Sequence, residues 1–542
     1  MDSKSPLAHV PFLWKRDITL IVAASLLFRA AAALPFRSPG YMDAFYYYVN
    51  AWRIAAGRGL TEPFIWNYLS PHLQLPMPAF QYWMPLTSFL IVPFFAAFGI
   101  SFRSAQLPFI LLSSLLPALA YLISLHLSPA RRTAWFSAAL TLITPSYLKF
   151  WATTDNFTPF ALLGCLALLS GWRAIVTRRR RWFFLAGLLI GLAHLTRADA
   201  PLLFAAILLT ALFPGPDSSS WRKRPSVLLA GFSLMAAGYL LPLIPWLWHN
   251  WHAAGALWNP AGTRTLFLRS YDELFSAQAQ LSLAAYLEWG WRSILASKLS
   301  AGWRNALTLI GAMLALYLAP FAGIELWKRR HAAMTRLVLS YLLLLYLVMT
   351  LLFTFPGPRG SFLHSGAALL PFLMAYAQHG LERAIHWASR RRGWETAQAL
   401  KVLSAGSLLI AALLALMLTG QALAGGGIAG PGWNEVGRIY LDVDAWLDAQ
   451  GLEPQTPVLV VDPPAFYYYT ERYSLAVPND PPEVVAEVCR RFGAEFLILE
   501  KDHPRPLRDI YQRKDGRPYF ELVHTLGASE EVQIYRCRTA RR

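Results

Sequence analysis

Long apolar stretches separated by short polar segments dominate the first 424 residues of the chain. Many of them contain about 20 residues, the length that an α-helix needs to cross the hydrocarbon core of a bilayer. The pattern predicts a polytopic helical membrane protein with about eleven spans. The spans are expected at 18–36, 105–127, 133–150, 157–175, 182–195, 201–213, 227–248, 306–327, 337–355, 362–376 and 402–423.

Basic residues gather in short clusters between these stretches, and the clusters set the expected orientation. Cytoplasmic loops carry an excess of lysine and arginine, so each cluster is placed on the inner side of the membrane. The N-terminus is then inside and everything after residue 424 is outside. The clusters lie at 15–16, 131–132, 178–181, 222–224, 328–330 and 390–392.

Two segments need separate treatment in this topology. Residues 83–100 are apolar but contain Pro85 and Pro93, and orientation allows one span or three between residues 36 and 131, where the apolar stretches are 83–100 and 105–127. We therefore expect 83–100 to form an interfacial or re-entrant segment on the outer side. Residues 249–304 are expected to form a long external loop.

The composition changes after residue 424, where three glycines are followed by PGW, which is typical of a linker. Residues 1–424 are predicted to form the membrane domain and 425–542 a small soluble α/β domain. VLVVD at 458–462 and FLILE at 496–500 are expected to be parallel strands, with a helix between them. The tail contains no phosphate-binding glycine motif, so we expect it to give support or recognise an acceptor.

Composition and charge agree with a membrane protein. The chain is 56% hydrophobic and 15% charged, with a mean hydropathy of +0.37, which is too apolar for a large soluble enzyme. The net charge of +18 lies mostly in the clusters between spans, which argues against nucleic acid as a partner. Three cysteines form no disulfide framework, and Cys489 and Cys537 are expected to pair only if the tail faces an oxidising compartment.

Several ionisable residues are expected together on the outer side of the membrane. Asp43 and Glu62 lie in the first external loop and Asp155 in the second, while Arg197 and Arg359 lie at two further external turns. Loops on a rigid scaffold often carry binding and catalytic groups. An arginine near the hydrocarbon edge is costly unless it reaches the interface or meets an anion, and its guanidinium matches phosphate oxygens.

This combination favours sugar transfer from a lipid-phosphate carrier. A hydroxyl nucleophile needs a base, which a carboxylate can supply, whereas the departing phosphate needs a cation more than a proton donor. Glycoside hydrolysis differs because its leaving group requires a second carboxyl group as acid. On a helix that begins near Asp43, Asp43 and Tyr47 share one face, and the apolar face with Phe45 can lie on the lipid. Asp43 is therefore the expected base and Tyr47 an expected substrate contact.

The acidic and aromatic residues also have simpler interpretations, which the sequence leaves open. Asp43 is well placed to cap a helix through its side chain. Residues 46–48, three consecutive tyrosines, are typical of an interfacial aromatic belt. Asp155 can be an ordinary loop residue or a cap, and Glu62 can be an ordinary surface residue.

The basic residues have similar alternatives. Arg197 can simply pair with Asp199, because exposed ion pairs are common and weak. Arg359 can be an anchor that extends its charge to the interface. His364 is more typical of a satisfied polar residue than of a metal ligand, because the chain has no HExxH motif or paired-histidine spacing.

Four segments together resemble the GT-C glycosyltransferases, membrane enzymes that use polyprenyl-phosphate carriers. The family includes protein O-mannosyltransferases, oligosaccharyltransferase catalytic subunits and the lipid A aminoarabinose transferase. The resemblance covers roughly residues 15–380. The segments are MDAFYYYVNAWRIAAGRGLTEPFIWNYL, TTDNF, GLAHLTRAD and PRGSFLHSGAALLPF.

The resemblance implies roles for individual residues. Asp43 would contact the acceptor, Asp155 would help to form the catalytic or metal site, and Arg359 would engage the carrier phosphate. It also implies juxtamembrane helices in the first external loop, whereas the role of Glu62 differs across the family. Asp43 is followed by Ala44 instead of a second acid, and Asp155 lacks the spaced second acid of oligosaccharyltransferases. The metal requirement and the acceptor class are therefore not carried over.

The sequence thus predicts an inverting glycosyltransferase of the cytoplasmic membrane, with its site and its C-terminal domain on the extracytoplasmic side. Its donor would be a polyprenyl-phosphate sugar, and its acceptor a lipid, a glycan or a protein. A divalent metal, if used, would lie at Asp43, Asp155 or Glu62. The alternative is a lipid-linked sugar flippase or transporter, but such proteins tend to carry paired halves and ionisable groups near the bilayer midplane. A noncatalytic scaffold is a third interpretation.

Overall fold

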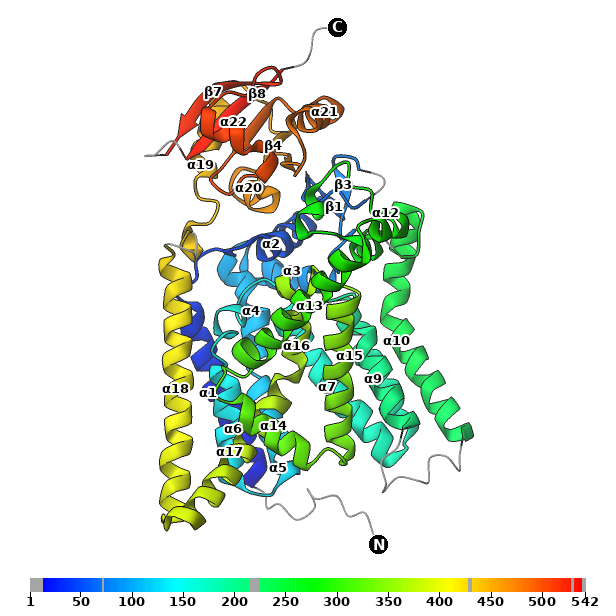
Figure 1. Ribbon diagram of the computed structural model, residues 1–542, viewed down its shortest axis with the longest axis vertical. Helices are drawn as coiled ribbons and strands as arrows, with labels where there is room; N and C mark the ends of the chain where they lie inside the picture. The colour runs from blue at the N-terminus through cyan, green and yellow to red at the C-terminus, as the bar shows by residue number, and fades with distance from the viewer. Residues whose placement is uncertain are drawn as a thin grey trace.

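The structure is a computed structural model that describes residues 13–70, 73–213, 225–258, 260–426, 431–527 and 531–538. A helical bundle fills one end and a small α/β domain the other, with a layer of short elements between them (Figure 1). The predicted basic cluster at 222–224 lies outside the described residues. The main bundle helices are α1 (Leu13–Ala33), α4 (Phe102–Ser113), α5 (Leu116–Leu127), α6 (Arg131–Ile143), α7 (Phe157–Thr177), α8 (Arg180–His194), α9 (Pro201–Leu212), α10 (Pro225–Ala254), α13 (Trp291–Leu307), α14 (Ala319–Lys328), α15 (Ala333–Leu351), α16 (Phe362–Gly366), α17 (Leu370–Arg392) and α18 (Thr396–Ala424).

The bundle contains helices of membrane-spanning length, which confirms the predicted class of polytopic membrane protein. Among the described residues, five helical stretches are long and apolar enough to cross a bilayer, and two further apolar helices are shorter. The expected number of about eleven spans stays a prediction. The five stretches are Phe102–Leu127, Phe157–Thr177, Ser226–Ala253, Ala333–Leu351 and Thr396–Ala424.

Two predicted segments have a different course. The continuous span expected at 306–327 is broken, because Ala315 and Leu316 have positive φ angles of 48° and 62° between α13 and α14. The prediction of a long loop at 249–304 is also partly wrong, because helix α13 begins at Trp291. The break contains no proline or glycine between residues 314 and 318, so the periodicity of apolar residues gave no sign of it.

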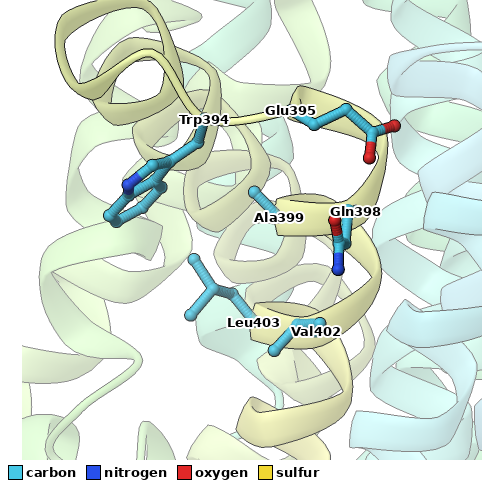
Figure 2. A pocket seen from close by; sticks show the side chains of 6 residues that line it. All are labelled: Trp394, Glu395, Gln398, Ala399, Val402 and Leu403. Carbon is cyan, nitrogen blue, oxygen red and sulfur yellow. The ribbon is translucent and has the colours of Figure 1, made fainter.

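One end of the bundle collects the basic residues. Arg131 at the start of α6 pairs with Asp17 of α1 at 2.6 Å, and Arg383 of α17 pairs with Glu325 of α14 at 2.8 Å. An open pocket lies at the turn from α17 to α18, lined by Trp394 and the first two turns of α18 (Figure 2). This end is opposite the α/β domain (Figure 1), as expected if the basic clusters share one side of the membrane.

A layer of short elements covers the other end of the bundle. It includes α2 (Met42–Ala55), β1 (Thr61–Glu62), β3 (Met77–Pro78), α3 (Leu86–Phe98), η5 (Tyr271–Phe275) and α12 (Leu283–Glu288). The helix α3 has only 13 residues and contains Pro93. It lies beside α2 at this end of the bundle (Figure 1), in agreement with an interfacial segment at 83–100.

The C-terminal domain is built on a six-stranded sheet of order β2-β5-β4-β6-β8-β7. As predicted, β4 (Val458–Val460) and β6 (Phe496–Leu499) are parallel neighbours, and α21 (Pro482–Phe492) precedes β6. The sequence did not reveal β5 (Ser474–Ala476), α20 (Pro463–Thr470) or the antiparallel pair β7 (Phe520–Leu526) and β8 (Val532–Cys537). The remaining helices are α19 (Tyr440–Ala449) and α22 (Arg508–Arg513).

The edge strand β2 (Phe64–Ile65) comes from the first external loop and not from the tail. It pairs in parallel with β5, and both of its side chains are fully buried. Trp433, just after α18, adds a second connection because its indole N–H donates to the Ser38 carbonyl oxygen at 3.0 Å. Residues on both sides of the predicted domain boundary therefore form one hydrogen-bonded unit.

Cys489 and Cys537 form a disulfide, and Cys165 is buried and free. We expect one maleimide–polyethylene glycol adduct per denatured chain without reductant, and three after reduction, because the chain has three cysteines. Gel mobility of the labelled protein measures this number. Three adducts without reductant would contradict the disulfide. The variant Cys165→Ser should give no adduct without reductant.

Candidate functional site

The second external loop is fixed against the start of α2. Thr154 donates its hydroxyl hydrogen to the Ala44 carbonyl oxygen at 2.8 Å, and Thr153 donates to the Pro39 carbonyl oxygen at 3.4 Å. All four residues are buried or nearly so. The two threonines of the TTDNF segment thus attach one loop to the other and place Asp155 beside the first turn of α2.

Two aspartates and a histidine meet at this junction. Ligand atoms of Asp43, Asp155 and His364 all lie within 4.8 Å of one another. The Nδ1 atom of His364 is 3.9 Å from Oδ2 of Asp155 and 2.6 Å from Oδ1 of Asn156. The residues come from α2, the loop before α7 and α16, so three segments distant in sequence build one polar cluster.

The two carboxylates have different surroundings. Asp155 is buried, and its oxygens accept hydrogen bonds from the Tyr41 hydroxyl at 2.6 Å and the Asn156 backbone N–H at 2.5 Å. Asp43 is only partly buried, and no side chain within the described residues donates a hydrogen bond to it. Asp43 is therefore the carboxylate with lone pairs available to an incoming group.

Electrostatics couple the two carboxylates. Burial and the nearby charge of Asp155 raise the pKa of Asp43 well above its usual range, while the Arg197 guanidinium opposes this rise. Burial also raises the pKa of Asp155, although its bonds from Tyr41 and Asn156 favour the charged form. Two close carboxylates titrate as a pair, and the fully ionised pair binds its first proton more strongly than an isolated aspartate does.

Arg197 lies at the edge of the cluster. Its Nε donates to the Ser365 hydroxyl at 2.9 Å and to Asp199 at 3.2 Å, and one terminal nitrogen is 3.4 Å from Oδ1 of Asn156. Ser365 in turn donates to Asp199. The predicted ion pair between Arg197 and Asp199 is present, and it holds a positive charge next to the aspartates.

Arg359 is exposed and stands apart from ion pairs. Its guanidinium carbon lies 5.0 Å from the centre of the Tyr271 ring, and within the described residues it has no carboxylate partner. Gly360, with a φ of +136°, turns the chain between Arg359 and His364. The charge of Asp43 helps to raise the pKa of Tyr271. The contact between Arg359 and the Tyr271 ring therefore lies within electrostatic range of the cluster.

Comparisons with known proteins decide the fold. The structure is similar to that of ArnT from Cupriavidus metallidurans in the apo state, with 15% identity and a TM-score of 0.54. It is also similar to ArnT of the same organism bound to undecaprenyl phosphate, with 13% identity and a TM-score of 0.57; each match covers 96% of this chain and 98% of that chain. The chain has the GT-C glycosyltransferase fold.

Two further comparisons agree with the GT-C fold. The structure is similar to an Archaeoglobus fulgidus oligosaccharyltransferase in complex with Zn and sulfate, with 14% identity and a TM-score of 0.51. That match covers 95% of this chain and 72% of the other. Residues 80–249 match the family of dolichyl-phosphate-mannose-protein mannosyltransferases. No curated protein has a significant sequence match to the chain.

The GT-C fold brings together most of the residues predicted from the sequence. Asp43 and Asp155 are in the cluster, and Arg197 borders it. Tyr47 joins it through its hydroxyl oxygen, which accepts a hydrogen bond from the Asn156 side-chain amide at 3.1 Å. The functional roles assigned to these residues stay predictions.

Three expectations about α2 are wrong. The helix begins at Met42, so Asp43 lies in its first turn and does not act as the N-cap residue. Residues 46–48 form no interfacial belt, because all three tyrosines are buried. Phe45 does not face lipid, since its ring lies 5.0 Å from that of Tyr468 in α20. The C-terminal domain covers the helix face that the sequence assigned to the membrane (Figure 1).

Glu62 is separate from the cluster, contrary to its predicted place in a substrate or metal site. Its side chain is 1% exposed, and one carboxyl oxygen accepts hydrogen bonds from the Tyr46 hydroxyl and the Phe80 backbone N–H, the latter at 2.7 Å. Phe80 has a positive φ of 61°. Glu62 therefore fixes a turn of the first external loop against α2.

Glu62 is expected to make stability depend on pH. Burial raises its pKa from 4.5 to about 8, so the folded protein holds a proton that the unfolded chain has released. Stability should fall between about pH 4.5 and 8, by up to about 1.4 kcal/mol per unit. Glu62→Gln keeps an acceptor without a charge and should lack this decrease. Melting temperatures in detergent at pH 5, 6, 7 and 8 measure it.

Exposed Glu453, changed to Gln, is the control for this measurement. It should melt with the same pH dependence as the wild type. Parallel curves for wild type and Glu62→Gln would contradict a protonated Glu62.

Sequence reasoning missed four members of the site. Tyr41, Asn156 and Ser365 were not proposed, and His364 was assigned to an ordinary polar role. Asn156, which contacts Tyr47, His364 and Arg197, follows Asp155 directly. His364 and Ser365 lie in the segment PRGSFLHS, but histidine spacing alone carries no sign of a partner on another loop.

Proposed function

We propose that this chain is an inverting glycosyltransferase that moves a sugar from a polyprenyl-phosphate carrier to an acceptor hydroxyl or related nucleophile. The observation that carries this proposal is the partly exposed Asp43 beside buried Asp155, within a GT-C fold. The undecaprenyl phosphate bound to ArnT and the name of the matching mannosyltransferase family support the class of donor.

In the proposed reaction, Asp43 accepts the proton of the acceptor hydroxyl. The acceptor oxygen attacks the anomeric carbon from the face opposite the phosphate, and the bond from that carbon to the phosphate oxygen breaks. The carrier phosphate leaves with the electron pair, so a single displacement inverts the configuration. Arg359 is the proposed partner of the departing phosphate, because its guanidinium is exposed and has no carboxylate partner among the described residues.

Asp155 and Arg197 are proposed to position this chemistry. Asp155 is held by Tyr41 and Asn156, and its charge makes Asp43 a stronger base. The positive charge of Arg197 lowers the pKa of both aspartates, so it limits the rise that burial and their mutual repulsion cause. Tyr47 is proposed to contact the substrate from the next turn of α2.

A divalent metal would be held by Asp43, Asp155 and His364. The two carboxylates suit Mn²⁺ or Mg²⁺, whereas the imidazole suits Mn²⁺ better than Mg²⁺, which prefers oxygen ligands. His364 Nδ1 lies 2.6 Å from Oδ1 of Asn156, to which it donates a hydrogen bond, and it would have to give up that bond to hold an ion. When bound, such an ion would supply a positive charge for a phosphate oxygen. Dialysis against a chelator, followed by addition of Mn²⁺ or Mg²⁺, tests whether transfer depends on a metal.

The proposed location is the cytoplasmic membrane, with the site and the C-terminal domain on the outer side. The Cys489–Cys537 disulfide supports this orientation, because disulfides persist in oxidising compartments. A cysteine at exposed position 442 should react with an impermeant maleimide in intact cells, whereas one at exposed position 391 should react only after lysis. The reverse pattern would contradict the orientation.

Radiolabelled polyprenyl-phosphate sugar incubated with membranes tests the function itself. Covalent transfer of label to a lipid, glycan or protein fraction is expected, with the opposite anomeric configuration to that of the donor. Label that crosses the membrane while still attached to its carrier would instead support a flippase.

A further inference from the structure

A cavity of about 280 Å³ lies between the C-terminal sheet and the layer that covers the bundle. Val461 and Val477 line it just after β4 and β5, and Asp502 lines it just after β6. The carboxyl ends of three neighbouring parallel strands thus open into one space. Parallel α/β sheets commonly bind their ligands at this edge.

The cavity adjoins the catalytic cluster. Met42, which precedes Asp43 in α2, is part of its wall. Asp462, which follows Val461 and caps α20, is close enough for its charge to raise the pKa of Asp43. A molecule held against Met42 would therefore contact the residue that precedes the proposed base.

Three charged side chains of the wall are free to bind. Asp272, Asp502 and Arg505 form no ion pair or side-chain hydrogen bond with the residues that the structure describes. Asp502 and Arg505 are exposed to solvent, and Asp272 is partly exposed. The wall thus offers carboxylate acceptors and a guanidinium donor, together with the apolar side chains of Met42 and the strand-end valines.

This mixture matches a carbohydrate better than a lipid tail or a basic peptide. Sugar hydroxyls both donate and accept hydrogen bonds, so they can use acids and an arginine in the same site, while the C–H faces of a ring suit apolar contacts. A lipid tail would leave the two carboxylates unpaired, and a basic peptide would meet the charge of Arg505.

We propose that this cavity is the acceptor subsite and that it binds a saccharide, with the sugar hydroxyl to be glycosylated directed toward Asp43. The inference rests on the proposed function, since only a transferase has an acceptor. It gives the C-terminal domain a direct part in selecting the acceptor.

Two variants of exposed residues test the subsite by steady-state kinetics. Asp502→Asn should raise the KM for the acceptor about tenfold, the effect of losing one charged hydrogen bond, and Arg505→Trp should block the cavity with a similar or larger effect. The KM for the donor should stay within about twofold. Asp509→Asn and Arg508→Trp, which change exposed residues of α22 outside the lining, are matched controls and should behave as wild type.

Binding provides a second readout that does not need turnover. The full-length protein in detergent is titrated with neutral and acidic oligosaccharides, free and attached to lipid, and with basic peptides of similar size. Binding of oligosaccharides that weakens in Asp502→Asn is expected, and comparison of the free and lipid-linked forms identifies the source. Preference for peptides would overturn the proposal.

Failure of the subsite and failure of the function are distinguishable. Unchanged acceptor KM in both variants, in an enzyme that Asp43→Asn inactivates, would remove the subsite and leave the transferase intact. Absence of any transfer by the wild type would remove the proposed function and the acceptor role with it.

Discussion

Asp43→Asn should lower the rate of sugar transfer by about 10²- to 10⁴-fold, the usual contribution of a general base. Asparagine has nearly the same shape, but its amide cannot accept the proton of the acceptor hydroxyl. The KM for the donor should change little, because Asp43 is assigned to the acceptor side. Initial rates with radiolabelled donor, together with the melting temperature of the purified variant, measure these effects.

The control is Asp442→Asn, which removes an exposed carboxylate of α19 that has no partner among the described residues. It should transfer sugar at the wild-type rate. In the wild type, kcat/KM should rise with pH as the Asp43–Asp155 pair loses its protons, because both pKa values are raised and the base must be ionised. Normal transfer by folded Asp43→Asn would exclude Asp43 as the base.

Arg359→Gln should raise the KM for the lipid-phosphate donor by about 10- to 100-fold, since a hydrogen bond to a charged group contributes about 1.5–3 kcal/mol. Arg359 is exposed and contacts only the Tyr271 ring among the described residues, so its loss leaves no buried charge behind. Arg359→Lys should recover part of the affinity, because lysine keeps the charge but lacks the planar fork. Donor titrations at saturating acceptor measure both variants.

Arg508→Gln is the matched control for charge, because Arg508 is exposed in α22 and lies outside the site. A donor KM that rises equally in Arg359→Gln and Arg508→Gln would indicate a general effect of surface charge. Wild-type kinetics in Arg359→Gln would assign the carrier phosphate to another cation.

The sequence was most informative where one physical rule acts alone. Length and hydropathy predicted the apolar helices, and the basic clusters predicted that Asp43 and Asp155 emerge at the same end of the bundle. The parallel pair of β4 and β6 was readable because each is a short continuous apolar run. These features depend on local composition, which a single sequence contains.

The features that the sequence did not reveal depend on contacts between distant segments. The residues around Glu62 do not indicate that its carboxylate accepts a hydrogen bond from the Phe80 N–H. Those around Phe45 do not indicate a contact with the ring of Tyr468. His364 looked ordinary because its neighbours Asn156 and Asp155 are about 200 positions away in the chain. Long-range pairing of this kind has no periodicity to read.

The two-residue strand β2 determines which fragments of this protein keep a complete sheet. A fragment that starts after α18 would lack Phe64 and Ile65. The strand β5 would then be an exposed edge strand whose backbone groups can pair with other chains. We expect such a fragment to self-associate. Chimeras between relatives should therefore exchange the first external loop and the tail as a matched set.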